Sequence, residues 1–301
     1  MARIGFVGVG TMGLPMATNL ATKGFAVTAF DVNPEAVRAA AAAGMTAAAS
    51  SAEAVAGADI VVTMLPSSPH VESAYTGDGG VLAAARKGTL CVDMSTIDPG
   101  VSRRMAAAAA ERGVRFVDAP VSGGVPRAVD GTLAIMVGGA EADFRSALPV
   151  LEAMGANIFH VGKVGSGEVV KLCNNLVAGV AAVAVSEAFR LAEAFGVDAR
   201  VVTDVIAKSS GNTWVMEAMH PVPGVVPRAA SSNGYKPGFM TDLMCKDVGL
   251  AVDAARARRI PMFVAPAAQQ VYRLASSHGL GRQDFTSVYT FLKPSSDQSP
   301  V

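Results

Sequence analysis

Residues 4–13 read Ile-Gly-Phe-Val-Gly-Val-Gly-Thr-Met-Gly, and this stretch decides the fold of the first half of the chain. Three glycines follow an apolar run in the spacing Gly8-x-Gly10-x-x-Gly13 and precede a helix-favouring segment. In a strand-to-helix turn, the first glycine permits the tight bend, the second lets a pyrophosphate approach the backbone, and the third lets helix and strand pack closely. The helix N-terminus then presents free N–H groups to the phosphates. The pattern predicts a dinucleotide-binding turn.

Asp31 indicates which dinucleotide is bound. It directly follows the second predicted strand and lies about 20 residues beyond the glycine motif, where a carboxylate accepts hydrogen bonds from the ribose hydroxyls. A carboxylate there also repels a 2′-phosphate, and the next residues, Val32 and Asn33, supply no arginine to bind one. The sequence therefore predicts NAD as cofactor rather than NADP.

Short β-rich runs alternate with helix-favouring segments through the first half of the chain. This alternation predicts a Rossmann-type α/β fold, in which a doubly wound parallel sheet has helices on both faces. A last short strand over 157–162 ends the alternation. The other predicted strands are 3–9, 25–30, 58–65, 88–94, 114–119 and 133–137, and the main predicted helices are 14–23, 34–43 and 101–112.

The second half of the chain is predicted to be helical. Residues 166–195 form one long, mostly apolar segment, with Ser166 placed to cap a helix and Gly196 placed to end it. The helical pattern then continues to residue 291, apart from a loop rich in Pro and Gly over 220–238. We expect a dinucleotide-binding domain (1–164), a connecting helix (165–195), an all-α domain for substrate and oligomerisation (196–292), and a disordered polar tail (293–301).

Composition excludes several classes of protein. Of the 301 residues, 51% are hydrophobic and the net charge is zero, so a large core is available and nothing attracts nucleic acid. The most apolar part of the long helix is too short to span a bilayer, which indicates a buried helix and no membrane partner. No targeting segment is visible, so we expect a cytoplasmic protein. Three widely separated cysteines indicate neither disulfides nor a metal site.

Four sequence motifs follow one another along the chain: the opening run 5–20, Asp118-Ala-Pro-Val-Ser-Gly-Gly124, the glycine segment 131–139, and Gly165-Ser-Gly-Glu-Val-Val-Lys-Leu-Cys-Asn-Asn175. In this order they resemble the β-hydroxyacid dehydrogenase family, and the resemblance covers residues 1–292. It implies an oxidoreductase that removes a hydride from a 3-hydroxy acid with NAD. A further segment over 243–250, Leu-Met-Cys-Lys-Asp-Val-Gly-Leu, also matches.

Lys171 and Asn175 are the predicted catalytic residues. They are spaced i, i+4 on the long helix and therefore share one face, with the lysine placed to take the alcohol proton and the amide to orient the hydroxyl. The positive helix end and a positively charged nicotinamide favour the neutral amine. Ser122, Gly123 and Gly124 offer a hydroxyl and backbone N–H groups to the substrate carboxylate.

The family resemblance implies further site residues. Phe239 and Asp247 join the substrate site. The cofactor site contains the three motif glycines and Asp31, together with Thr11, Met12, Leu65, Pro66, His70, Thr96 and Lys246.

The loops 221–225 and 232–239 resemble the branch of the family that oxidises 3-hydroxyisobutyrate in valine breakdown. Trp214, Phe239 and Met240 are available to cover the methyl group of that substrate, and too few cations are present for a phosphorylated one. The alternatives are a tartronate semialdehyde reductase, another short 3-hydroxyacid dehydrogenase and, less favoured because Lys171 is present, a non-catalytic NAD-binding scaffold. The long apolar helix predicts a homodimer or homotetramer.

Overall fold

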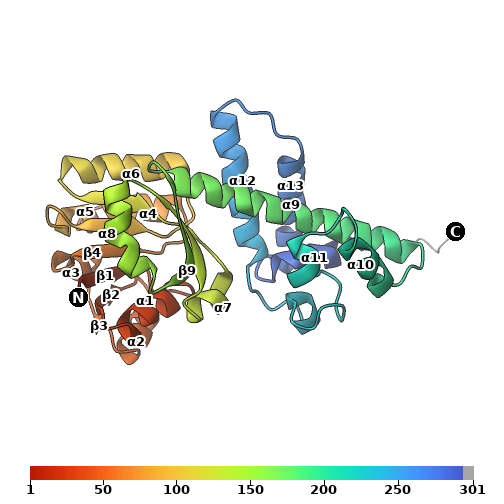
Figure 1. Cartoon of the computed structure of the whole chain (residues 1–301), viewed down its shortest axis with the longest axis horizontal. Helices are drawn as coiled ribbons and strands as arrows, with labels where there is room; N and C mark the ends of the chain where they lie inside the picture. The colour runs from red at the N-terminus through yellow and green to blue at the C-terminus, as the bar shows by residue number, and fades with distance from the viewer. Residues whose placement is uncertain (294–301) are drawn as a thin grey trace. The chain divides into compact units, whose positions relative to one another are not determined.

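The computed structural model describes residues 1–293, and the remainder of the predicted polar tail lies outside the described residues. The chain divides into two compact units, unit 1 (Met1–Lys171) and unit 2, which begins at Leu172. The division falls inside the long helix α9 (Ser166–Ala194), so both units contribute to this helix (Figure 1).

Unit 1 is built on one mostly parallel sheet, as the strand–helix alternation predicts. The strand order is β3-β2-β1-β4-β5-β6-β8-β7, with β9 paired in parallel to β8. Strand β8 runs antiparallel to β6 and β7, which the sequence did not indicate. The two-residue strands β3 and β7 are too short to show a periodicity. The strands are β1 (Arg3–Val7), β2 (Ala26–Phe30), β3 (Thr46–Ala47), β4 (Ile60–Thr63), β5 (Leu90–Asp93), β6 (Arg115–Asp118), β7 (Val121–Ser122), β8 (Leu133–Gly138) and β9 (Gly155–Gly162).

The central strands of this sheet are buried on both faces, which explains why they read as continuous apolar runs. Phe6 and Val62 enter one core, whereas their neighbours Val7 and Val61 enter the other. The first core also takes side chains from α1 (Gly13–Thr22), α2 (Pro34–Ala42), α7 (Gly124–Val129) and α8 (Glu141–Leu151). The second takes them from α3 (Ser51–Ala56), α4 (Ser68–Thr76), α5 (Val81–Ala84) and α6 (Pro99–Glu111).

Helix α9 begins and ends for different reasons. Ser166 is its first helical residue and not the N-cap that the sequence predicted; the free N–H groups at its start bond instead to Asp118 of β6. Its end is local, as predicted: Gly196 adopts a φ of 70°, and Val197 donates its N–H to the Ala192 carbonyl at 3.0 Å. This is the bonding pattern of a glycine-terminated helix.

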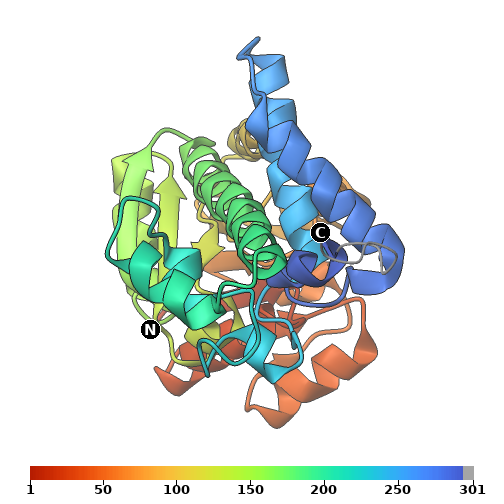
Figure 2. The ribbon, with the colours of Figure 1, turned by 90° about the vertical axis from the view of Figure 1, so that its right-hand side faces the viewer.

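Unit 2 is helical, as predicted. Helices α12 and α13 lie side by side (Figures 1 and 2) and share one core with α9 and α11. Within the loop over 220–238, the only regular element is a 3-10 turn, Ala230–Asn233. Helix α9 is long and apolar enough to cross a membrane, but it carries buried Ser186 and Arg190, as a core helix does. The helices of unit 2 after α9 are α10 (Ala199–Ala207), α11 (Trp214–Ala218), α12 (Thr241–Ala257), α13 (Val264–Ala275) and α14 (Val288–Phe291).

Candidate functional site

The glycine turn between β1 and α1 has the shape that a dinucleotide pyrophosphate requires. Gly8 adopts a φ of 96°, and a Cβ there would lie 2.3 Å from the Met64 carbonyl oxygen. A Cβ on Gly13 would lie 1.9 Å from the Gly8 carbonyl oxygen, whereas a Cβ on Gly10 would meet nothing within 4 Å. Because Gly8 and Gly13 are needed for packing and Gly10 faces open space, this turn fits a bound pyrophosphate at Gly10.

Asp31 lies beside this turn. Gly8 donates its N–H to the carbonyl of Phe30 at 2.8 Å, which brings the turn next to the end of β2 where Asp31 stands half-buried. Thr11 is exposed and Met12 half-buried at the start of α1. The predicted cofactor residues of the first β-α-β segment therefore meet at one edge of the sheet.

Two more predicted cofactor loops meet at the carboxyl ends of β4 and β5. The Leu65 N–H donates to Ser95 Oγ at 2.9 Å, and Ser95 Oγ donates to Asp93 Oδ1 at 2.6 Å. This chain ties the Leu65–Pro66 loop to the segment that carries Thr96. Burial raises the pKa of Asp93, and the hydrogen bonds from the Ser95 and Thr63 hydroxyls partly offset this rise.

His70 lies on α4, which begins just after the Leu65–Pro66 loop. Its ring is exposed, and Nδ1 is 2.7 Å from Ser67 Oγ. The imidazole is therefore accessible to a ribose or phosphate oxygen, the role that the family resemblance assigns to it.

Ser122, Gly123 and Gly124 lie where β7 turns into α7: Ser122 ends the strand, Gly123 links the two elements and Gly124 begins the helix. The φ angles of Gly123 and Gly124 are 137° and 65°, so this turn depends on glycine at both positions. Ser122 is half-buried and pairs with Ala134 of β8. A turn of this kind presents consecutive backbone N–H groups, which suits a carboxylate.

Asp118 anchors the start of α9. Its Oδ1 accepts from the Gly165 N–H at 2.6 Å and its Oδ2 from the Glu168 N–H at 3.0 Å. Gly138 and Gly167 leave room for it, because a Cβ on either would lie within 2.8 Å of a carboxylate oxygen of Asp118. Burial raises the pKa of Asp118 to about 6, against the backbone N–H groups that lower it.

Lys171 lies in the second turn of the helix that Asp118 anchors, and only 5% of its surface is exposed. Glu168, three residues earlier, is fully buried. Its Oε2 accepts from the Ile97 N–H at 3.1 Å, directly after Thr96. One carboxylate thus connects the predicted catalytic helix to a predicted cofactor loop inside unit 1.

In unit 2, a hydrogen-bonded chain holds Asn175. The amide Nδ2 of Asn175 donates to Asp247 Oδ2 at 2.6 Å, and its Oδ1 accepts from Asn174 at 3.1 Å. Asp247 is buried, and its Oδ1 forms an ion pair with Lys246 Nζ at 3.2 Å. Asn175, Lys246 and Asp247 are therefore brought together, whereas the sequence placed Lys246 on the cofactor side and Asp247 on the substrate side.

The predicted apolar side chains of unit 2 are partly accessible. Phe239 and Met240 are half-buried just before α12, and Phe239 packs edge-to-face against Phe285. Trp214, the first residue of α11, is 57% exposed. These surfaces are available for apolar contact.

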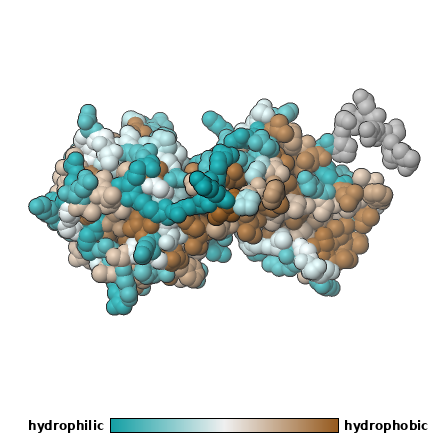
Figure 3. All heavy atoms as spheres, turned by 90° about the horizontal axis from the view of Figure 1, so that it is seen from above, coloured by the Kyte–Doolittle hydropathy of each residue, from teal (hydrophilic) through white to brown (hydrophobic). Residues whose placement is uncertain are grey.

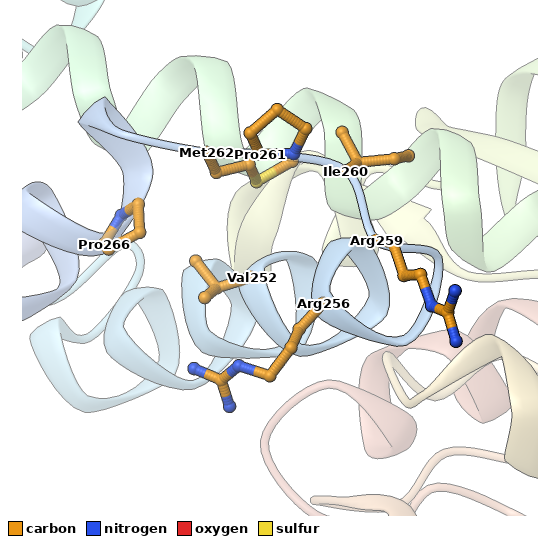
Figure 4. Close-up of a pocket in the computed structure, with 7 residues that line it drawn as sticks. All are labelled: Val252, Arg256, Arg259, Ile260, Pro261, Met262 and Pro266. Carbon is orange, nitrogen blue, oxygen red and sulfur yellow. The ribbon is translucent and has the colours of Figure 1, made fainter.

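A pocket of about 340 Å³ in unit 2 contains none of the predicted site residues (Figure 4). Its lining comes from α12, the loop that follows α12, and the start of α13. Within residues 1–293, no group of three or more His, Cys, Asp or Glu side chains is arranged to hold a metal ion. The lining residues of the pocket are Val252, Arg256, Arg259, Ile260, Pro261, Met262 and Pro266.

Sequence reasoning missed four buried polar residues near these groups: Asp93, Ser95, Asp118 and Glu168. A signal was present for the two aspartates, because each ends an apolar strand at the carboxyl edge of the sheet, where sites in such folds form. Glu168 lies inside a quoted motif, but only its burial and its bond to Ile97 distinguish it from a solvent-exposed glutamate.

Two family models match the chain. Residues 3–162 match the NAD binding domain of 6-phosphogluconate dehydrogenase, and residues 165–292 match the NAD-binding domain of NADP-dependent 3-hydroxyisobutyrate dehydrogenase. Together the two matches span nearly the whole of the described chain.

Similar proteins agree with these matches. The NAD-dependent L-serine dehydrogenase of Pseudomonas aeruginosa is 44% identical over 99% of this chain and 100% of its own length. The mitochondrial 3-hydroxyisobutyrate dehydrogenase of Mus musculus is 41% identical over 96% of this chain and 87% of its own. The solved structure of Mycobacterium tuberculosis 3-hydroxyisobutyrate dehydrogenase with L-serine has 44% identity and a TM-score of 0.93, covering 98% of this chain and 100% of that one.

Proposed function

The chain belongs to the β-hydroxyacid dehydrogenase family and is an NAD-dependent oxidoreductase, and from this premise we propose that it oxidises 3-hydroxyisobutyrate to methylmalonate semialdehyde. The observation that carries the proposal is the pair Lys171 and Asn175, buried one turn apart on α9 in a chain with a formed dinucleotide turn. Such a reaction places the protein in valine breakdown.

Bound NAD supplies the hydride acceptor. The Lys171 amine takes the proton of the substrate hydroxyl as the C–H bond gives up its hydride, so that the alcohol becomes a carbonyl. Burial of Lys171 keeps bulk water away from this proton transfer. Asn175 holds the hydroxyl toward the amine, and its own orientation is fixed by Asp247 and Asn174.

The turn of Ser122, Gly123 and Gly124 binds the substrate carboxylate in this proposal. The positive φ angles of both glycines are typical of turns that present consecutive N–H groups to an anion, and Ser122 adds a hydroxyl donor. Asp31 selects NAD over NADP, since its carboxylate stands next to the glycine turn and repels a 2′-phosphate.

The choice among small 3-hydroxy acids rests on the side chain at C2. The half-buried Phe239 and Met240 and the exposed Trp214 offer apolar surface to a methyl group. An apolar contact of one methyl is worth roughly 1–3 kcal/mol, or ten- to about two-hundredfold in kcat/KM. This contact favours 3-hydroxyisobutyrate over glycerate and tartronate semialdehyde, which carry a hydroxyl instead.

L-Serine is the second candidate substrate, because a relative 44% identical over nearly the whole chain is named an L-serine dehydrogenase. L-Serine is also a 3-hydroxy acid and would use the same lysine and the same carboxylate turn. Its ammonium group needs an oxygen acceptor where 3-hydroxyisobutyrate needs an apolar wall.

A panel of substrates assayed with NAD and NADP separates these candidates. We expect kcat/KM for 3-hydroxyisobutyrate to exceed those for L-serine and glycerate by about tenfold or more. If L-serine is preferred, L-serine replaces 3-hydroxyisobutyrate as the proposed substrate, and the proposed role of Lys171 is unchanged. If the protein oxidises none of these three substrates with either cofactor, the proposed function is rejected.

We also propose that the chain acts as a cytoplasmic homodimer or homotetramer. Figure 3 shows hydrophobic atoms gathered on unit 2, and none of the residues of α10 is buried. Contiguous apolar surface of this kind marks an interface between proteins. Light scattering of the wild-type chain and of Phe195→Lys tests it: a monomeric wild type would reject the oligomer. The exposed apolar side chains at the end of α9 and along α10 are Leu191, Phe195, Val197, Val201 and Val205.

A further inference from the structure

Glu168 is a fully buried carboxylate that the proposed chemistry does not use. It lies in the first turn of α9, its backbone N–H is bound by Asp118, and its Oε2 accepts from the Ile97 N–H at 3.1 Å. A carboxylate removed from water is costly unless its charge is compensated. A neutral glutamine would accept the same hydrogen bond, so the bond to Ile97 by itself does not explain an acid.

A charged partner, Lys171, would explain why an acid stands at position 168. It stands three residues after Glu168, and residues spaced i, i+3 on a helix are neighbours about 5–6 Å apart at Cβ. Long side chains on a helix lean toward its N-terminus, which directs the lysine back over the turn that contains Glu168. Both side chains are buried, so the charge of one acts on the other through little water.

We propose that Glu168 is a positioning residue for the reaction. It holds the Lys171 amine in a fixed position relative to the Thr96–Ile97 loop, and it stabilises the ammonium form of the lysine once the lysine has taken the proton. This inference rests on the proposed role of Lys171. A nearby carboxylate makes the amine a stronger base, because it favours the ammonium form that the oxidation produces. The same carboxylate accepts from Ile97, which directly follows Thr96, a residue that the family resemblance places in the cofactor site.

Other charged groups surround this end of α9. Asp118 of β6 binds the helix start, and Asp93 of β5 lies next to it in the sheet. On α6, the Arg103 Nε would be 3.0 Å from a Cβ on Gly165, and Lys163 is exposed in the turn before the helix. In unit 2, Lys246 and Asp247 form an ion pair beside Asn175. None of these groups lies one helical turn from Lys171 on its own helix, as Glu168 does.

Glu168→Gln removes the charge and keeps an acceptor for Ile97. The direct measurement is the NMR titration of the Lys171 side chain in ¹³C-lysine-labelled protein without cofactor. The Lys171 signal is identified by its absence from the Lys171→Arg variant. We expect this signal to titrate about one to three pH units lower in Glu168→Gln than in the wild type. The acid limb of the pH profile of kcat/KM should move in the same direction.

Two comparisons separate charge from packing. Glu187→Gln makes the same change at an exposed position of α9 and should leave the titration unchanged. Glu168→Ala should also expose the Ile97 N–H to faster hydrogen exchange, whereas Glu168→Gln should not.

An unchanged titration of Lys171 in Glu168→Gln would overturn the inference, even if Lys171→Ala abolished turnover. Full turnover in Lys171→Ala would reject the proposed role of the lysine instead. The titration and the turnover of Lys171→Ala thus tell the two failures apart.

Discussion

Asn175 of α9 donates its side-chain N–H to Oδ2 of Asp247 of α12 at 2.6 Å, although the two residues are 72 positions apart in the sequence. An amide that donates to a fixed carboxylate cannot rotate by 180° without losing that bond. Since Asn174 donates to the other end of the same amide, Asn175 is held in one orientation. The proposed role of Asn175 toward a substrate hydroxyl therefore depends on Asp247.

Asp247→Ala should lower kcat while NAD binding stays close to normal. The substitution frees the Asn175 amide to rotate and removes the ion-pair partner of Lys246. A hydrogen bond to a charged group is worth roughly 1.5–3 kcal/mol, which corresponds to a loss of about ten- to a hundredfold. Asp247→Asn keeps one acceptor and should lose less. Equal losses in both variants would mean that the charge, and not the orientation of the amide, is what matters.

Lys171→Ala should lose most of kcat, because the proton-transfer group is gone and the dinucleotide turn is untouched. Groups of this kind contribute about 10²–10⁴-fold. Steady-state rates with 3-hydroxyisobutyrate, together with the Kd for NADH from its fluorescence, separate chemistry from binding. Near-normal turnover would assign the proton to another residue.

Replacing Asp31 should change the choice of cofactor. In Asp31→Ser/Val32→Arg, the repelling carboxylate is replaced by a cation for the 2′-phosphate, so KM for NADP should fall and KM for NAD should rise. Val32 is 91% exposed beside the turn, so the arginine needs no repacking. The measurement is kcat/KM for both cofactors. A wild-type enzyme that already prefers NADP would show that Asp31 does not select the cofactor.

Gly10→Ala and Gly13→Ala should fail in different ways. A methyl at Gly10 meets no atom within 4 Å, so Tm should be unchanged while the Kd for NAD rises about tenfold or more, because the methyl occupies the pyrophosphate position. A methyl at Gly13 lies 1.9 Å from the Gly8 carbonyl oxygen, and crowding of this kind costs about 1–3 kcal/mol of stability. Calorimetry for Tm and titration with NAD measure both. Intact NAD binding in Gly10→Ala would place the pyrophosphate elsewhere.

Unit 2 should lose stability in acid through His220. The ring is fully buried, its Nδ1 accepts from the Val222 N–H, and its Nε2 is 3.0 Å from Thr203 Oγ1. Burial lowers the pKa of His220 to about 4, from an ordinary 6.5. Between pH 6.5 and 4 the imidazole is therefore protonated in the unfolded chain but not in the folded chain. The free energy of unfolding is highest above pH 6.5 and falls as the pH drops toward 4. At about 1.4 kcal/mol per unit, the loss is roughly 3 kcal/mol.

Urea unfolding between pH 4 and 7 checks this dependence. His220→Asn keeps an acceptor for Val222 without a basic ring, so it should be less stable overall but lose less between pH 6.5 and 4 than the wild type. The matched control is His278→Asn, at an exposed histidine of the same unit, which should keep the wild-type dependence. A dependence that survives in His220→Asn would assign it to other groups.

The sequence by itself determined the features that local spacing controls. The glycine spacing around Gly10 predicts the turn, and the structure agrees: a Cβ would clash at Gly8 and at Gly13, whereas Gly10 leaves open space. The central strands of unit 1 can be predicted because they are buried on both faces of the sheet and are therefore continuous apolar runs. Gly196 ends α9 through bonds to residues within one turn of it. Lys171 and Asn175 share a face because helical spacing alone requires it.

The tertiary structure decided which distant groups complete these local features. The start of α9 is capped by Asp118 from β6 and not by its own Ser166, since the turn before the helix lies against that strand. Asp247 orients Asn175, and Glu168 accepts from Ile97. The pKa of His220 is lowered because the fold of unit 2 buries its ring. Each effect depends on burial or on a contact between residues far apart in the chain. Burial and long-range contacts leave no periodicity and no residue spacing in the sequence, so the sequence alone does not predict these effects.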